Sequence, residues 1–203
     1  MPEATAAAHA SFLLTMPSGS PFALTAFWFA GDRESASNVQ IAASQWERKT
    51  QQWTAAQFVV NRHALGEQLG FGVRRLGNPV AWMDANQKMH LFIVATGWGG
   101  WAASRIVHLR QSEGPGLPGV LRFEPMRMIP LSWMWNTSYL VRNAPLRLQD
   151  GGAVLPVHFE LGIKYPVMVR LNRDGEFVGR VRMSNRHDAL QPTLVAQEPS
   201  SWL

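Results

Sequence analysis

Three short turn clusters recur along the chain at intervals of roughly 65 residues: "PSGS" at 17–20, "DANQ" at 84–87 and "QDGG" at 149–152. Each cluster is preceded by a short apolar segment and followed by a strongly apolar one. Because Gly, Pro, Asn and Asp between apolar runs mark tight turns, this pattern predicts antiparallel hairpins. The regular interval indicates that one structural unit is repeated three times.

The segments after each turn cluster follow one order. The first is the most apolar of its unit ("FALTAFWFA", "MHLFIVAT" and "AVLPVHF"), as expected for a central buried strand. A third strand follows a longer loop, and a more polar fourth strand closes the unit. Repeated four-stranded antiparallel units are typical of β-propeller blades. We therefore predict an all-β propeller with about three blades, at approximately 11–60, 78–130 and 137–184; a Greek-key sandwich is the alternative.

Two segments depart from the repeat. "RHALGEQLG" at 62–70 has leucines four residues apart and ends on glycine, which predicts a short helix. "LQPTLVAQ", from about residue 189, predicts the first strand of a fourth blade. Since propellers close with four to eight blades, we expect residues 1–203 to form one propeller domain that is incomplete at its C-terminus. A homodimer or a missing C-terminal half would close it.

Composition narrows the classes of partner. Of the 19 Lys and Arg residues only three are lysine, and the net charge is +5, but the arginines are scattered, with pairs only at Arg74–Arg75 and Arg180/Arg182. Clustered charge is the mark of nucleic-acid binding, so we expect no nucleic-acid partner. No apolar run reaches the about 18 residues of a membrane span. The N-terminal segment lacks the basic start of a signal peptide, which predicts a cytoplasmic location, or a secreted or periplasmic one if upstream sequence is missing.

Several segments, in this order, resemble one known family. They are "HAS" at 9–11, "FWFAGDRESASNVQIAAS" at 27–44, "RRLGNPVAWMDANQKMHLFIV" at 74–94, "GGWAASRI" at 99–106, "LVRNAPLRLQDGGAVLPVHFELGIKYP" at 140–166 and "ALQPTLV" at 189–195. Together they resemble the N-terminal half of the sialidase-like (neuraminidase-repeat-like) six-bladed propellers, in the large bacterial branch of predicted exo-sialidases. The resemblance implies an exo-acting glycoside hydrolase that cleaves terminal sialic-acid-like or other acidic sugars from glycans.

Such a reaction needs an acid that protonates the leaving oxygen, a nucleophile, and arginines that hold a carboxylate. "GDRE" follows a predicted buried strand and offers Asp32 or Glu34 as the acid, with Arg33 as an anion clamp; a solvated turn is the alternative. In the third unit, His158 and Glu160 alternate with Phe159 and share one face of a strand, as an acid–base pair would.

The loops at one end of the blades are expected to carry the remaining substrate-binding residues. Trp98 is a candidate platform for a sugar face, whereas Trp101 is as well explained by packing between blades. The full set of predicted substrate-binding residues is His9, Arg33, Arg75, Asn78, Trp98, Arg105, Arg142, Lys164, Arg186 and Gln191. Without cysteine or a metal-binding histidine spacing, we expect no catalytic metal, and no nucleotide or other cofactor motif is present.

Two departures from the family weaken the hydrolase hypothesis. Asn38 stands where the family often has an aspartate ahead of the third strand of the first blade, and the tyrosine–glutamate nucleophile pair and part of the arginine triad of sialidases usually lie further along the chain, in a region largely absent here. The Asp-box turns that sialidases carry are degenerate at 44–53 and 112–119, but they are folding turns, so this departure says little about chemistry. A non-catalytic carbohydrate-binding propeller, or a truncated inactive sialidase-like protein, is therefore the main alternative. A different sugar chemistry on the same scaffold, such as a rhamnosidase or a lyase, is a third.

Overall fold

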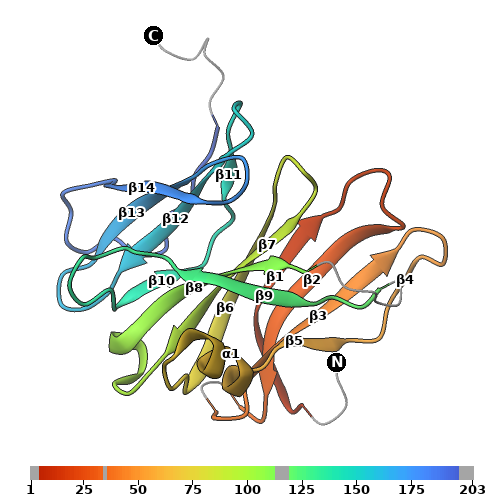
Figure 1. The fold of residues 1–203 in the computed structure, drawn as a ribbon, viewed down its shortest axis with the longest axis horizontal. Coiled ribbons are helices and arrows are strands. Elements are labelled where there is room, and N and C mark those ends of the chain that lie inside the picture. Colours follow the sequence, from red (N-terminus) through yellow and green to blue (C-terminus); the bar gives the residue numbers. More distant parts are fainter. Residues whose placement is uncertain (1–4, 34–35, 113–118, 197–203) are drawn as a thin grey trace.

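The computed structural model describes residues 5–33, 36–112 and 119–196, which form three antiparallel sheets in sequence order (Figure 1). The first sheet contains β1 (Ala7–Thr15), β2 (Phe22–Gly31), β3 (Gln40–Glu47), β4 (Gln52–Trp53) and β5 (Gln57–Val60). The second contains β6 (Arg75–Met83), β7 (Met89–Thr96), β8 (Ser104–Gln111) and β9 (Phe123–Met128). The third contains β10 (Tyr139–Val141), β11 (Leu146–Arg147), β12 (Ala153–Phe159), β13 (Tyr165–Leu171) and β14 (Phe177–Arg182).

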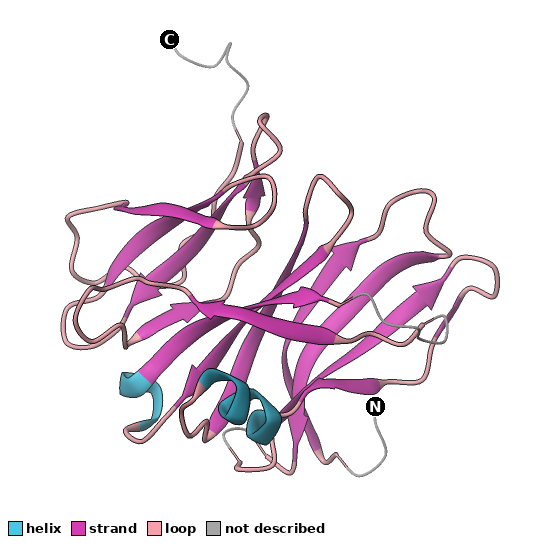
Figure 2. Ribbon diagram, viewed as in Figure 1, coloured by secondary structure: helices cyan, strands magenta, loops and turns pink. Residues whose placement is uncertain are grey.

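Strands dominate this architecture, as Figure 2 shows, and within each sheet they lie in the order in which they occur in the chain. The predicted all-β fold of repeated four-stranded antiparallel units is confirmed. The predicted central strands coincide with β2, β7 and β12, because a strand with neighbours on both sides needs an apolar run. The three sheets stack side by side, with β1 and β6 in contact and β10 against β6 and β8.

The edge strands differ from the prediction in detail. In the first sheet the predicted outer strand at 51–60 is divided into β4 and β5, and both pair with β3. In the third sheet the predicted first strand is divided into β10 and β11 around Pro145, which has no N–H to donate to a ladder. No strand forms within 189–196, where the fourth blade was expected to begin; an isolated bridge joins Asp188 to Lys164 instead.

Two apolar cores separate the three sheets, and β7 contributes to both. All eight residues of β7 are buried. Met89, Leu91 and Ile93 belong to the core between the first and second sheets. Phe92 and Val94 face the other way, into the core between the second and third sheets. This alternation follows from the two-residue period of a strand, and it fixes the middle sheet from both sides.

A buried chain of polar side chains lies where the second sheet meets the third. His90 Nδ1 lies 2.8 Å from His108 Nε2, and His90 Nε2 lies 3.2 Å from Asp84 Oδ2. All three side chains are almost completely buried. The turn that contains Gly175 packs against the His90 ring from the third sheet, and Trp82 packs beside the same ring.

One helix, α1 (Arg62–Leu69), connects the first sheet to the second and confirms the predicted helix. It begins at Asn61, whose Oδ1 accepts hydrogen bonds from the backbone N–H groups of His63 and Ala64, and it ends at Gly70 in the left-handed conformation. No helix within the described residues is long and apolar enough to cross a membrane.

Candidate functional site

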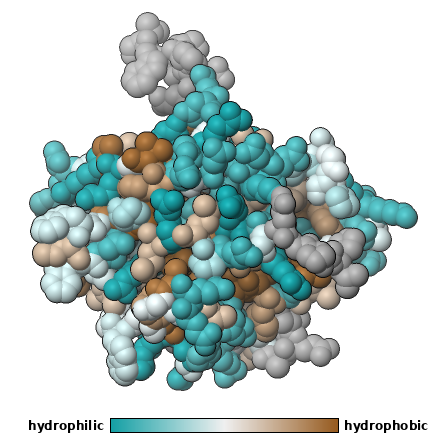
Figure 3. Space-filling view, viewed as in Figure 1, coloured by the Kyte–Doolittle hydropathy of each residue, from teal (hydrophilic) through white to brown (hydrophobic). Residues whose placement is uncertain are grey.

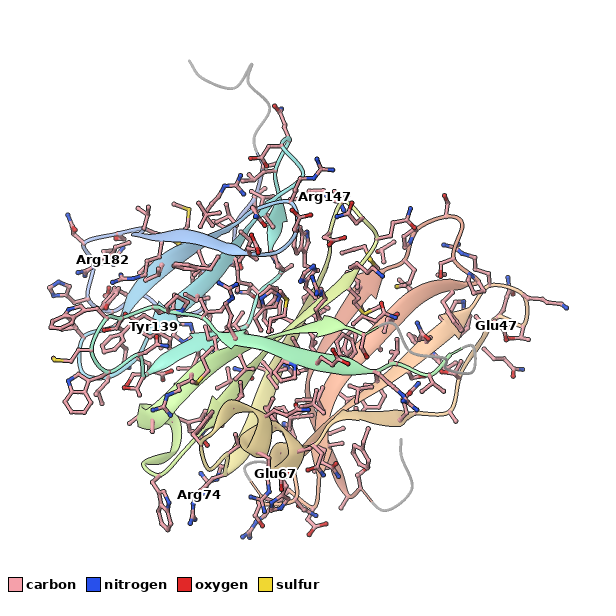
Figure 4. All side chains as sticks on the ribbon, viewed as in Figure 1. Glu47, Glu67, Arg74, Tyr139, Arg147 and Arg182 are labelled. Atoms are coloured by element: carbon pink, nitrogen blue, oxygen red, sulfur yellow. The ribbon has the colours of Figure 1, made fainter. Side chains whose placement is uncertain are left out.

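One edge of the three sheets collects the loops on which the site residues were predicted. We call it the loop edge and define it by the described residues of three segments, 31–33 with 36–39, 97–103 and 160–164, which leave β2, β7 and β12. The starts of β1, β6 and β10 reach the same edge, since each pairs in antiparallel register with the end of the strand that follows it. Arg74 lies at this edge and Arg147 at the opposite one (Figure 4).

Contacts along the loop edge order the first and second sheets internally and join the second sheet to the third. The His9 ring stacks on Phe29 with a centroid distance of 5.6 Å. A side chain at Gly77 would meet Trp101 at 3.1 Å, so the glycine allows the indole of the second sheet to approach its innermost strand closely. Ser104 Oγ donates to the carbonyl of Tyr139 at 3.1 Å. The predicted residues therefore stand on one continuous framework.

A cavity of about 780 Å³ opens on the loop edge between the first and second sheets. Four arginines contribute to its wall, and we call it the arginine pocket. Its lining residues are Arg33, Ala36, Ser37, Arg62, His63, Gly72, Val73, Arg74, Arg75, Thr96, Gly97, Trp98, Gly99 and Gly100. The structure thus brings together three of the predicted residues, Arg33, Arg75 and Trp98. No carboxylate is among the described residues of the wall.

Sequence analysis did not predict two of the four arginines that line this pocket. Arg62 and His63 belong to α1, and the fold of the helix against the second sheet carries them to the wall. Arg62 Nη1 donates to the carbonyl of Val73 at 3.2 Å, which holds its guanidinium at the pocket. Arg74, which was noted only as half of a pair, also reaches the cavity. The arginines are scattered in the sequence, and only the tertiary fold assembles them.

Trp98 stands at the mouth of the arginine pocket and is 78% exposed. The guanidinium carbon of Arg74 lies 3.2 Å from the centroid of its ring, a close cation–π contact. Glycines 99 and 100 have φ angles of 100° and 62°, which allow the chain to turn sharply after Trp98. Trp98 therefore has one face against a cation, while most of its surface is open to solvent.

The neighbouring residues of this loop have structural roles. Residues Gly100–Ala103 form a turn of 3-10 helix, η1. Within it, Trp101 packs against Gly77. Arg105 lies behind the wall, with its guanidinium carbon 4.9 Å from the Phe71 ring centroid. The interpretation of Trp101 as a packing residue is the one that the structure supports.

Of the acid candidates on the 31–39 loop, Asp32 is exposed, whereas Glu34 lies outside the described residues. The backbone N–H of Asp32 donates to Asn38 Oδ1 at 3.3 Å. The amide at position 38 therefore bridges the two ends of the loop.

The third sheet holds a second group of predicted residues. His158 Nε2 and Glu160 Oε2 are 3.4 Å apart, as expected from their shared strand face. His158 is almost completely buried, and burial lowers its pKa, although the Glu160 carboxylate acts in the opposite direction. Nearby, the backbone of Lys164 forms an isolated parallel β-bridge with that of Asp188, and Arg186 Nε lies 3.3 Å from Asp188 Oδ1.

The innermost segments of the sheets carry the remaining predicted residues. Asn78 and Gln191 have positive φ angles of 45° and 50°, and each precedes a proline. Asn143, which was not among the predicted binding residues, donates through Nδ2 to the carbonyls of Gln191 and Pro192 at 2.9 and 3.0 Å. Arg142 is half-buried beside it, between β10 and β11. Here an amide side chain holds the 191–192 segment against the third sheet.

The described residues include no group of three His, Cys, Asp or Glu side chains placed to hold a metal ion. No curated protein sequence matches the chain at a significant level. The family profile of the BNR repeat-like domain matches residues 23–202, which is most of the chain. The chain belongs to this family. The family confirms the resemblance to sialidase-like repeats that the sequence segments indicated.

Solved structures with the same fold are glycoside hydrolases by name. The chain superposes on the Hadza microbial sialidase Hz136 with a TM-score of 0.62 at 15% identity, covering 85% of this chain and 37% of that one. It superposes on a thermostable family-43 glycoside hydrolase with a TM-score of 0.55 at 15% identity, covering 95% and 56%. An exo-1,5-α-L-arabinanase from a bovine ruminal metagenomic library gives a TM-score of 0.51 at 15% identity, with 88% and 56% covered. The chain thus spans less than two thirds of each of these proteins, and the likeness establishes a partial propeller fold.

Proposed function

We propose that this chain is the substrate-binding part of an exo-acting glycoside hydrolase, and that it holds a terminal acidic sugar in the arginine pocket. The observation that carries the proposal is the convergence of Arg33, Arg62, Arg74 and Arg75 on one cavity whose described wall contains no carboxylate. Guanidinium groups pair with carboxylates in planar, two-point contacts. Four such groups, with no carboxylate beside them among the described lining residues, favour an anionic ligand.

The size and lining of the arginine pocket suit a single sugar unit. Its volume of about 780 Å³ lies within the 300–1,000 Å³ range of small-molecule sites. Trp98 offers an exposed aromatic surface at the mouth, and aromatic rings are common platforms for apolar faces. The Thr96 hydroxyl in the wall is buried and has no hydrogen-bond partner among the described residues, a state that a ligand oxygen or a water would relieve.

The acid that protonates the leaving oxygen is assigned in this proposal to Glu34 or Asp32, because these residues flank Arg33 in the sequence and Arg33 lies in the pocket wall. Glu160, paired with His158 on the third sheet, is the second carboxylate candidate. Retaining sialidases use a tyrosine nucleophile, and the chain has two tyrosines. Tyr139 is buried and its hydroxyl lies 3.3 Å from that of Tyr165, a pairing that, together with burial, raises the pKa of Tyr139.

This pairing favours the second candidate function, a carbohydrate-binding propeller without turnover of its own. The hydroxyl groups of the two tyrosines are hydrogen-bonded to each other in the third sheet. The Asn38 amide accepts a hydrogen bond from the backbone of its own loop, and an amide cannot serve as an acid. On this hypothesis the arginine pocket binds an acidic sugar and the nucleophile is supplied by another part of a longer chain, or is absent.

Calorimetric titration separates these possibilities from a purely structural role of the arginines. N-acetylneuraminate should bind, and galactose, which lacks a carboxylate, should not. The Arg33→Ala/Arg75→Ala variant should bind N-acetylneuraminate at least about tenfold more weakly, because two charge-assisted contacts are removed. Arg173→Ala, an exposed arginine outside the pocket, is the matched control. Equal affinity in the double variant would refute the assignment of the pocket.

Turnover is tested separately with fluorogenic sialosides, arabinosides and rhamnosides. If the wild-type chain releases the fluorophore and Glu34→Gln or Glu160→Gln does not, the result supports the hydrolase and identifies the acid. Binding without release supports the non-catalytic alternative, and release from arabinosides or rhamnosides alone supports a different sugar chemistry.

The first sheet also presents an uncovered apolar face, which bears on closure of the propeller. A hollow of about 1,210 Å³ on this face is lined largely by small and aromatic residues, including Ala26, Trp28, Trp53 and Phe58. The Trp28 indole N–H is buried and lacks a hydrogen-bond partner among the described residues. We propose that another sheet covers this face, either from a second copy or from further blades of a longer chain. Light scattering of the 203-residue chain distinguishes a dimer from a monomer.

A further inference from the structure

The loop between β9 and β10 projects two tryptophans into solvent. Trp133 is 91% exposed and Trp135 is 73% exposed, and Met134 between them is exposed as well. An indole in water is costly, and contiguous exposed apolar groups mark surfaces that contact another phase or molecule. Neither the arginine pocket nor the hollow on the first sheet includes these residues.

The conformation of this loop is fixed by a hydrogen-bond network, so the exposure does not come from a loose segment. Asn136, in a left-handed conformation, accepts hydrogen bonds through Oδ1 from the backbone N–H groups of Leu131 and Ser132. Its Nδ2 donates to the carbonyl of Ile129 at 2.9 Å. Ser138 Oγ donates to the carbonyl of Ala102 in η1, which precedes β8 of the neighbouring sheet. The tryptophans are therefore displayed by an anchored loop.

A second loop extends the apolar surface. Leu161 and Ile163, in the connection from β12 to β13, are also exposed. The two loops are neighbours, because β10 and β12 pair and the backbone N–H of Glu160 donates to the carbonyl of Ser138 at 3.0 Å. We call the five exposed side chains the apolar cap: Trp133, Met134, Trp135, Leu161 and Ile163. Figure 3 shows that apolar residues reach the surface in separate patches between polar ones.

The chemistry of the apolar cap distinguishes between possible occupants. A sugar presents hydroxyl groups that need hydrogen-bonding partners, but the amide of Asn136 and the hydroxyl of Ser138 are already used inside the loop. Three of the five side chains are aliphatic, and aliphatic groups gain little from a sugar. Indoles together with aliphatic side chains are the composition of segments that enter the headgroup boundary of a bilayer.

Positive charge borders the apolar cap. Lys164 follows Ile163, and the Arg182 guanidinium lies 4.3 Å from the Tyr165 ring centroid at the same end of the sheet (Figure 4). Arg182 donates to the carbonyls of Ser184 and Arg186, and no carboxylate pairs with it among the described residues. The border contains three cations, Lys164, Arg182 and Arg186. They outnumber its two acids, Glu160 and Asp188, and the chain as a whole carries a net charge of +5.

From these observations we propose that the apolar cap is a peripheral docking surface for an anionic lipid interface. The indoles and aliphatic side chains enter the headgroup region, and the bordering cations face anionic headgroups. The 160–164 loop belongs to the loop edge, so docking presents that edge to the membrane surface. The proposal does not depend on the function of the arginine pocket.

Vesicle flotation tests the proposal with two lipid compositions, phosphatidylcholine alone and a mixture of phosphatidylcholine with phosphatidylglycerol. The wild-type chain should float with the mixed vesicles and less with the neutral ones. Trp133→Ser/Trp135→Ser should lower the partition coefficient at least about tenfold, since most of the buried apolar area is removed. The control is Leu13→Ser/Val178→Ser, which removes two exposed apolar side chains outside the cap and should float like the wild type. Circular dichroism establishes that each variant is folded.

Other outcomes overturn the proposal. Absence of wild-type flotation does so, as does equal flotation of the wild type and the Trp133→Ser/Trp135→Ser variant. If the double variant instead loses binding to a neutral glycan, or loses self-association seen by light scattering, while no chain floats, the cap is a sugar platform or a protein interface.

Discussion

The buried Asp84–His90–His108 chain predicts a specific acid sensitivity of the fold. Burial lowers the pKa of His108 to about 3, and nearby positive charge on His90, Arg127 and Arg110 acts in the same direction. In the unfolded chain the same imidazole takes up its proton near pH 6.5. Between these values the unfolded state binds one more proton than the folded state, so the free energy of unfolding falls as the pH is lowered.

The magnitude follows from the linkage relation. One pH unit of full differential protonation corresponds to about 1.4 kcal/mol, and the unfolded imidazole is only half protonated at pH 6.5, so lowering the pH from 6.5 to 4.5 should cost about 2 kcal/mol through His108 alone. Burial also lowers the pKa of His90, although Asp84 and Asp174 act against that shift and Arg110 acts with it. Because typical domains are stable by only about 5–15 kcal/mol, His108 contributes a substantial part of acid unfolding.

His108→Phe isolates this contribution. A phenyl ring can stack on Phe92 as the imidazole does, at a centroid distance of 4.6 Å, but it leaves His90 Nδ1 without its partner. The variant should lose about 1–3 kcal/mol at pH 7 because of the unpaired nitrogen. Its stability should then fall less steeply with decreasing pH, by about 1.4 kcal/mol per unit below pH 6.5. Urea unfolding followed by tryptophan fluorescence between pH 7 and 4.5 gives both quantities.

His187→Gln is the control, because His187 is exposed. Its unfolding free energy should follow the wild-type pH dependence throughout. Parallel pH dependences for the wild type and His108→Phe would refute the reasoning, since they would mean that His108 titrates alike in the folded and unfolded chains.

Three further predictions concern the packing and the pocket. Gly175→Ala should lower the unfolding free energy by about 3 kcal/mol, because its φ of 81° disfavours a side chain and a Cβ would overlap the His90 ring; an unchanged melting temperature would contradict this. Asn61→Ala should cost about 1 kcal/mol by removing the cap of α1, measurable by thermal unfolding. Arg74→Leu should raise the mobility of Trp98, seen as lower fluorescence anisotropy, and anisotropy equal to the wild type would show that the cation–π contact does not orient the ring.

The elements that could be predicted correctly from the sequence are those that a local sequence pattern determines. Residues 89–96 form a strand because eight apolar-to-neutral residues between turn signals suit a strand packed on both faces. The segment 62–70 forms a helix because Asn61 and Gly70 provide its two caps. Register explains the His158–Glu160 pair, since alternate residues of a strand share a face.

The elements that sequence missed depend on contacts between distant segments. No local sequence pattern indicates that Arg62, on a helix, lines the same cavity as Arg33, on a loop of the preceding sheet. The hydrogen bond between His90 and His108 joins adjacent strands, and the spacing of the two residues matches no known motif. Asp32 and Glu34 remain predictions as acids, and so does the cytoplasmic location.

The sequential order of strands within each sheet has a consequence for how the chain folds. Every pairing in the three sheets joins strands that are neighbours in the chain or separated by one short strand. Each sheet can therefore form from hairpins as it leaves the ribosome, and the second sheet covers the first before the third has been synthesised. Stalled nascent chains ending after residue 130 should already resist protease in the first two sheets. Synthesis order and assembly order then coincide, which limits the time during which the apolar face of an early sheet stays uncovered by the next.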